Sequence, residues 1–205
     1  MGIYGERVLP HLINVACGVK AIGPSRERVC AGLVGEVVEI GFGSGHNVPY
    51  YPEAVHSVAA VEPSDVAWRI AGDRLGRSTV PVQRSGLDGQ VLPFPDDSFD
   101  SGLVTFSLCT IPDPGRALAE LRRVLRPGAT LHVLEHGLDA DPDVQKWQRR
   151  LDPLQGRLFG GCHFTRDVLG MFYAAGFDIK DAEHFYEKGT PRFAASNTLG
   201  VAVSA

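Results

Sequence analysis

The chain has 205 residues, 44% of them hydrophobic and 21% charged, which is enough apolar material for one globular domain with its own core. The formal net charge of -4 at pH 7 argues against a nucleic-acid-binding protein, because such proteins usually carry a clustered basic excess. Four cysteines occur without any C-x-x-C pair, so the sequence predicts no metal site and a reducing, cytoplasmic setting. A small-molecule partner is expected.

Short apolar segments alternate with helical stretches between residues 36 and 133. Each predicted strand is rich in β-branched or aromatic residues. These strands begin at Glu36, Ser57, Val80, Asp100 and Thr130. Such an alternation is typical of a doubly wound α/β fold, in which helices cover both faces of a parallel sheet.

Two helices are predicted from the residues at their ends. Asp113 is placed to cap a helix that reaches Leu125, and Pro114 occupies its first turn, where a missing N–H costs nothing. A later helix is predicted to start at Thr165 and to end near Gly176. The remaining tail, from 177 to 205, predicts two more strands.

Two segments lie outside this alternation, residues 1–35 and 139–163. We expect a single domain over 1–205, with these two segments as a cap over its site. The apolar stretch from 8 to 22 is interrupted by polar residues and is shorter than a membrane span of roughly 20 residues. It therefore predicts neither a signal peptide nor an integral membrane segment.

A glycine-rich loop follows the first predicted strand. Gly41, Gly43 and Gly45 stand where the backbone must turn sharply and approach a ligand. A dinucleotide fingerprint needs a third glycine at the position that His46 occupies, which weakens the hypothesis of a nicotinamide-dependent oxidoreductase. Taken alone, the loop is equally compatible with a tight turn between a strand and a helix.

An acidic residue, Glu62, ends the second predicted strand, about 20 residues beyond the first loop glycine. A carboxylate there can accept hydrogen bonds from both hydroxyls of a ribose. An isolated glutamate at a strand end is more often simply solvated. The combination with the glycine loop predicts a cofactor that contains ribose.

The segment 88–137 contains LPFPDDSFD and LRPGATLHVLEHG, and it resembles the ubiquinone-biosynthesis and type 11 group of class I methyltransferases. The resemblance implies their Rossmann-like doubly wound sheet of seven strands, mostly parallel with an antiparallel last strand. It also implies S-adenosyl-L-methionine as cofactor, with Asp88 accepting a hydrogen bond from the adenine amine. The residues expected to bind the cofactor are Glu39, Gly41, Gly43, Gly45, Asn47, Glu62, Pro63, Asp88, Gly89, Phe106 and Ser107.

Three further segments, YGERVLPHL, LEHG and WQRRLDPLQGRLFGGCHFTRDVL, resemble small methyltransferase-like proteins that methylate alkyl thiols. A thiol is partly ionised at neutral pH, whereas a phenol or a quinol needs a general base for transfer to oxygen or carbon. His136, after the fifth strand, is the candidate base, and its alternative role is to hold a loop. Tyr4, His11 and His163 are expected to line the substrate pocket. A non-catalytic protein that binds the cofactor is a third hypothesis.

Overall fold

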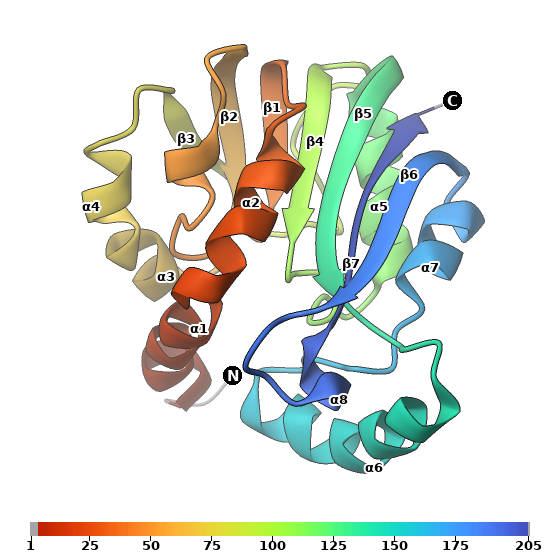
Figure 1. Ribbon diagram of the computed structural model, residues 1–205. Helices are drawn as coiled ribbons and strands as arrows, with labels where there is room; N and C mark the ends of the chain where they lie inside the picture. Colours follow the sequence, from red (N-terminus) through yellow and green to blue (C-terminus); the bar gives the residue numbers. More distant parts are fainter. Residues whose placement is uncertain (1–3, 205) are drawn as a thin grey trace.

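The computed structural model describes residues 4–204, which form one seven-stranded sheet with helices on both faces (Figure 1). The strands are β1 (Gly35–Ile40), β2 (Val55–Val61), β3 (Val82–Gly86), β4 (Phe99–Thr105), β5 (Leu125–His136), β6 (Phe177–Tyr186) and β7 (Ser196–Ser204). Their order across the sheet is β3-β2-β1-β4-β5-β7-β6. Strand β7 runs antiparallel to both of its neighbours, β5 and β6, and the other neighbouring pairs are parallel. The predicted sheet of class I methyltransferases is therefore confirmed.

Helices and short helical turns connect the strands. They are η1 (Tyr4–Val8), α1 (Leu9–Cys17), η2 (Lys20–Ile22), α2 (Gly23–Cys30), η3 (Val48–Tyr50), α3 (Asp65–Ile70), α4 (Gly72–Leu75), α5 (Pro114–Val124), α6 (Pro142–Leu158), α7 (Val168–Ala174) and α8 (Arg192–Ala195). Helix α2 lies on one face of the sheet, and α5 lies on the other (Figure 1). Within residues 4–204, no helix is long and apolar enough to cross a membrane.

The helix ends show where the sequence predictions succeed and fail. Asp113 caps α5 as predicted, because its carboxylate accepts the backbone N–H of Arg116 at 2.9 Å. The predicted start of the later helix at Thr165 is wrong. Helix α7 begins at Val168, because Asp167 accepts the N–H of Gly170 at 3.0 Å and supplies a charged cap.

The apolar core lies on both sides of the sheet. On one side the inward face of α5 buries Leu118 and Leu121 completely, in line with its helical periodicity. On the other side, α2 buries Val29 against Leu103 of β4 and Leu134 of β5. A sheet covered on both faces leaves the carboxyl ends of its parallel strands as the place for a ligand site.

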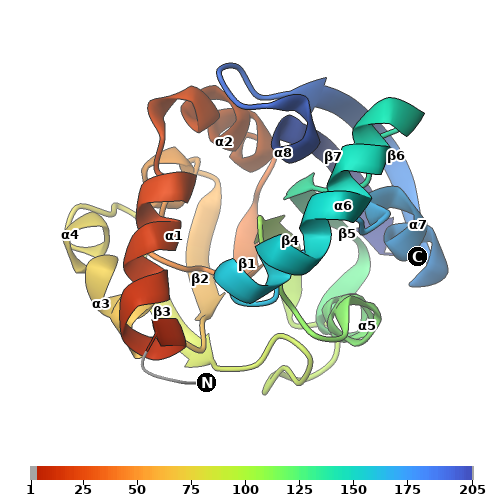
Figure 2. The ribbon, with the colours of Figure 1, turned by 90° about the horizontal axis from the view of Figure 1, so that it is seen from below.

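The two segments predicted to form a cap lie near that edge of the sheet. Residues 1–35 supply α1 and α2, and residues 139–163 supply α6. Seen from below, α1 and α6 lie in front of the strand ends (Figure 2). Their function as a cap stays a prediction.

Candidate active site

The glycine loop after β1 adopts the backbone conformation that its glycines favour. Gly41, Gly43 and Gly45 have φ angles of 70°, 59° and 76°, in the left-handed region where side chains are disfavoured. A Cβ on Gly41 would lie 1.9 Å from the hydroxyl oxygen of Ser107, so packing alone requires glycine there. A Cβ on Gly43 would meet nothing closer than 3.8 Å. Gly43 therefore leaves room in front of the loop.

Glu62, at the end of β2, is held against this loop. One carboxylate oxygen accepts the backbone N–H of Gly43 at 2.7 Å, and the other accepts the N–H of Ser64 at 2.7 Å. The side chain is buried, and burial raises the pKa of Glu62 while these two hydrogen bonds oppose the rise. Each oxygen keeps a further lone pair for a ligand hydroxyl.

Glu39, in β1, belongs to a buried polar network beside the loop. It accepts the side-chain N–H of Asn47 at 2.9 Å and the hydroxyl of Tyr51. Asn47 also donates to Thr105 at 2.9 Å. Burial raises the pKa of Glu39 to about 7, although both hydrogen bonds oppose this. These groups bond to one another, and direct contact of Glu39 and Asn47 with the cofactor stays a prediction.

Arg26, in α2, completes this network and was not found from the sequence. Its guanidinium donates to the side-chain oxygen of Asn47 at 2.6 Å and to the carbonyl of Cys17 at 3.2 Å. It lies 5.4 Å from the centre of the Phe106 ring, which is a cation–π contact. Burial lowers the pKa of Arg26, yet an arginine keeps its charge in a protein. A buried cation beside the glycine loop could hold a carboxylate, but no sequence motif marks it.

The adenine-binding prediction concerns the loop after β3. Asp88 is exposed there and accepts the backbone and side-chain N–H groups of Gln90 at 2.9 and 3.0 Å, which lowers its pKa. A Cβ on Gly89 would lie 2.7 Å from the side chain of Ile40, so a glycine is needed where the loop after β3 passes close to the end of β1. Pro63 is exposed and follows Glu62 directly after β2. The role of Asp88 as the acceptor for the adenine amine stays a prediction.

The end of β4 brings strained backbone into the site. Phe106 has a φ angle of 50°, which is unusual for a residue with a side chain and is common at functional sites. The backbone N–H groups of Ser107 and Leu108 both donate hydrogen bonds to the buried carboxylate of Glu135, with nitrogen–oxygen distances of 2.5 and 2.9 Å. Glu135 therefore fixes the loop that follows β4, a role that the sequence did not reveal.

His136, at the end of β5, lies among sulfur atoms and aromatic rings. Its Nε2 is 3.1 Å from the sulfur of Cys162, which is 3.6 Å from the sulfur of Cys109. Its ring stacks near Phe106, with 6.4 Å between the ring centres, and meets Phe164 edge-on at 5.6 Å. The sequence predicted His136 here but not the two cysteines.

The protonation state of His136 depends on these neighbours. Burial lowers the pKa of His136, but the hydrogen bond to Cys162 and nearby negative charges outweigh it, so the pKa is raised. Its Nδ1 is buried and has no hydrogen-bond partner among residues 4–204. The role of His136 as a catalytic base stays a prediction.

The residues predicted to line the substrate pocket are spread over the cap segments. The hydroxyl of Tyr4 donates to the carbonyl of Leu158 at 2.8 Å, so η1 is joined to the end of α6. The Nδ1 of His163 is bonded to the carboxylate of Asp152 in α6 at 2.8 Å. His11 lies exposed on α1. The structure does not bring the three side chains into one contact, and their substrate role stays a prediction.

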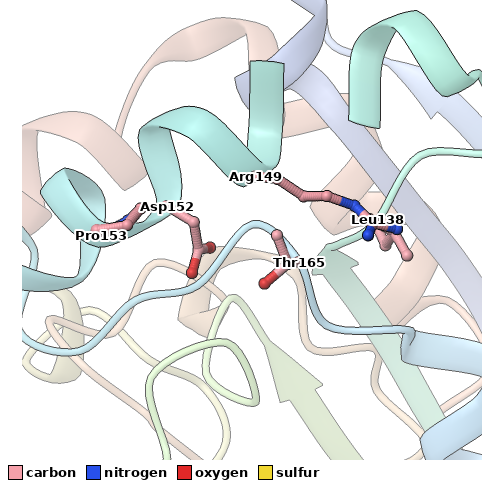
Figure 3. A pocket seen from close by; sticks show the side chains of 5 residues that line it. All are labelled: Leu138, Arg149, Asp152, Pro153 and Thr165. Carbon is pink, nitrogen blue, oxygen red and sulfur yellow. The ribbon is translucent and has the colours of Figure 1, made fainter. Parts of the chain in front are cut away.

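An open cavity of about 410 Å³ lies between α6 and the loop that precedes α7 (Figure 3). It is lined by Leu138, Arg149, Asp152, Pro153 and Thr165. No residue predicted for cofactor binding lines it. The glycine loop and the strand ends, rather than this cavity, define the candidate cofactor site.

Comparisons with known proteins find methyltransferases. A family model described as a methyltransferase domain matches residues 38–133. A human thiol S-methyltransferase is 29% identical over 154 residues, which cover 72% of this chain and 62% of the human protein. A demethylmenaquinone methyltransferase of Lactiplantibacillus plantarum is 30% identical over 195 residues, 85% of this chain and 73% of that protein. The chain thus spans less than two thirds of the human relative's length.

A solved structure supports the fold. A methyltransferase of Aquifex aeolicus described as dependent on S-adenosylmethionine superimposes with a TM-score of 0.66 at 17% identity, covering 96% of this chain and 98% of that one. The fold, the glycine loop and the acidic end of β2 define a class I methyltransferase domain. The chain belongs to the family of S-adenosylmethionine-dependent methyltransferases that the sequence predicted.

Proposed function

We propose that this chain transfers a methyl group from S-adenosylmethionine to a small-molecule thiol. The observation that carries the proposal is the hydrogen bond between Glu62 and Gly43, because it holds a carboxylate suited to ribose hydroxyls beside a loop that leaves room for a ligand. Similarity to a thiol S-methyltransferase supports the choice of acceptor.

Each part of the cofactor has a matching group in the protein. Glu62 accepts the ribose hydroxyls, and Asp88 accepts the adenine amine. Arg26 provides the positive charge for the methionine carboxylate. The bound cofactor supplies an electrophilic methyl group, so the protein has to position the acceptor and exclude water rather than activate the donor.

The acceptor is placed at the ends of β4 and β5. The rings of Phe106 and Phe164 flank His136 and give this place apolar walls, which exclude water from the reacting atoms. If the proton of His136 lies on Nε2 toward Cys162, Nδ1 can accept a hydrogen bond, and it has no such bond from another group within residues 4–204. An acceptor thiol can hydrogen-bond to that nitrogen.

Methylation of a phenol or quinol on carbon or oxygen is the second candidate. It is favoured by the match to a demethylmenaquinone methyltransferase, which covers more of both chains than the match to the thiol S-methyltransferase. In this reaction the free Nδ1 of His136 takes a proton from the acceptor and acts as a general base. The two candidates use the same cofactor site and differ in the acceptor.

A methyl-transfer assay with labelled S-adenosylmethionine tests the proposal. Panels of alkyl thiols, phenols, quinols and carboxylates are incubated with the protein, and labelled products are separated by chromatography. We expect label in a thioether, and clearly less of it with Glu62→Gln at cofactor concentrations that just saturate the unmodified protein. Label only in phenols or quinols favours the second candidate, and cofactor binding without any label contradicts both.

A further inference from the structure

Three side chains from separate parts of the chain converge around His136. The sulfur atoms of Cys109 and Cys162 and a ring nitrogen of His136 all lie within 4.8 Å of one another. The two sulfurs are 3.6 Å apart, and the sulfur of Cys162 is 3.1 Å from Nε2 of His136. We propose that Cys109, His136 and Cys162 bind one Zn²⁺ ion.

The distances fit a tetrahedral ion. Zinc bonds of about 2.3 Å to sulfur and about 2.0 Å to nitrogen place two sulfur ligands about 3.8 Å apart and a sulfur and a nitrogen about 3.5 Å apart. The Cys109–Cys162 and Cys162–His136 separations differ from these values by only a few tenths of an ångström, and the third pair lies within 4.8 Å. Small side-chain adjustments therefore bring the three groups to bonding distance from one ion.

The backbone around the three ligands is fixed by contacts that do not involve their side chains. The N–H of His163 donates to the carbonyl of Cys109 at 3.0 Å, which ties the two cysteine-bearing loops together. The guanidinium of Arg166 donates to the carbonyl of Ile111 at 2.7 Å. Glu135 holds the preceding N–H groups of the loop after β4. These supports orient the ligands before the ion binds.

The type and number of ligands select the metal and its role. Thiolate and imidazole groups suit Zn²⁺, whereas Mg²⁺ and Ca²⁺ prefer oxygen ligands. Among the residues that the structure describes, this cluster consists of three possible ligands, two cysteines and one histidine. Three protein ligands leave a fourth position open, as in catalytic zinc sites, whereas structural zinc sites are closed by four.

The open position fits an acceptor thiol, a role that rests on the proposed function. A thiol sulfur that binds Zn²⁺ releases its proton to solvent and remains a thiolate at neutral pH. The sulfur–methyl bond forms as the methyl–sulfonium bond of the donor breaks, and the neutral thioether leaves the ion. In this state Nε2 of His136 is a ligand and its Nδ1 carries the proton, so the reaction needs no general base.

Metal titration tests the site independently of catalysis. Protein purified under reducing conditions and freed of metal with a chelator is titrated with Zn²⁺, and with Co²⁺ to observe thiolate-to-metal absorption. We expect one ion per chain, with affinity at least about 100-fold weaker in Cys109→Ser, Cys162→Ser and His136→Asn. The half-buried thiol of Cys17 lies outside the group, so Cys17→Ser should bind the ion normally.

The same proteins separate failure of the site from failure of the proposed function. No saturable binding, or binding by Cys109→Ser and Cys162→Ser as tight as that of the unmodified protein, overturns the zinc site. A disulfide between these two cysteines that persists in protein purified under the same reducing conditions also overturns it. Zinc binding together with methylation of phenols alone supports the site and refutes the thiol acceptor. Equal thiol turnover by metal-free and zinc-loaded protein refutes the role of the ion and leaves the proposed function intact.

Discussion

The carboxylate of Glu62 accepts the backbone N–H of Gly43, with 2.7 Å between oxygen and nitrogen. This hydrogen bond joins the end of β2 to the loop after β1, the two places where the sequence predicts cofactor contacts. The carboxylate predicted to bind ribose and the loop are therefore held in a fixed relation, and changes at either residue should affect cofactor affinity.

Replacing Glu62 by Gln should weaken S-adenosylmethionine binding by about 1.5–3 kcal/mol, the range for hydrogen bonds to a charged group. Glutamine keeps the size of the side chain but loses the charge and one acceptor. Titration calorimetry measures the loss, and thermal unfolding checks that the variant is folded. Glu53→Gln is the matched control because Glu53 is exposed before β2. Equal affinity in both variants would show that the ribose site lies elsewhere.

Alanine at Gly43 should lower cofactor affinity at least tenfold, about 1.4 kcal/mol, because its methyl group would occupy the space in front of the loop. Gly128→Ala is a matched control. Gly43 and Gly128 have φ angles of 59° and 79°, and a Cβ has ample room at both. Both variants should lose roughly 1–2 kcal/mol of stability from backbone strain. Only Gly43→Ala should bind the cofactor weakly; a loss of affinity in both would point to strain alone.

The buried carboxyl of Glu39 should make stability fall as pH rises. Its pKa is raised by burial from an ordinary 4.5 to about 7, so between these values the folded state holds the proton more tightly than the unfolded chain. The resulting stabilisation is complete below pH 4.5 and is lost as pH rises through 7. Relative to Glu39→Gln, the unmodified protein should lose about 3 kcal/mol across this window. Urea unfolding at a series of pH values measures the difference, and parallel curves would refute it.

Paired variants distinguish the two roles of His136. If it acts as a base for a phenol or quinol, His136→Asn should reduce turnover by about 10²–10⁴, and Cys109→Ser should leave turnover nearly unchanged. If both side chains bind zinc for a thiol acceptor, both variants should lose turnover to a similar extent. Cofactor affinity, measured in parallel, should remain normal in both. Loss of turnover only in Cys109→Ser would contradict both roles.

The sequence predicted features that depend on local chemistry. Glycines between a strand and a helix require particular backbone angles, and Gly41 and Gly43 adopt them. The cap at Asp113 was confirmed for the same reason. The mostly parallel sheet of seven strands was also confirmed, but that prediction came from the family resemblance. The start of α7 was misplaced because Thr165 and Asp167 both qualify as capping residues, and only the structure shows which one bonds to the helix.

The sequence did not predict contacts that depend on tertiary folding. The zinc-site residues come from three parts of the chain: Cys109 follows β4, His136 ends β5 and Cys162 follows α6. They meet only because the ends of β4 and β5 are neighbours and the loop after α6 returns to them. Arg26 reads as an ordinary charged residue of an N-terminal helix until its burial beside Asn47 is known. Spacing along the chain carries no signal for such clusters.

Titration calorimetry with S-adenosylmethionine, its demethylated product and a nicotinamide dinucleotide tests the central claim most directly. The loop spacing G-x-G-x-G and the orientation of Glu62 predict measurable heat for the first two ligands and poor binding of the third. S-adenosylmethionine and its demethylated product should each bind at one site per chain, with affinity reduced in Glu62→Gln. Tight binding of the dinucleotide with no heat from S-adenosylmethionine would contradict the account.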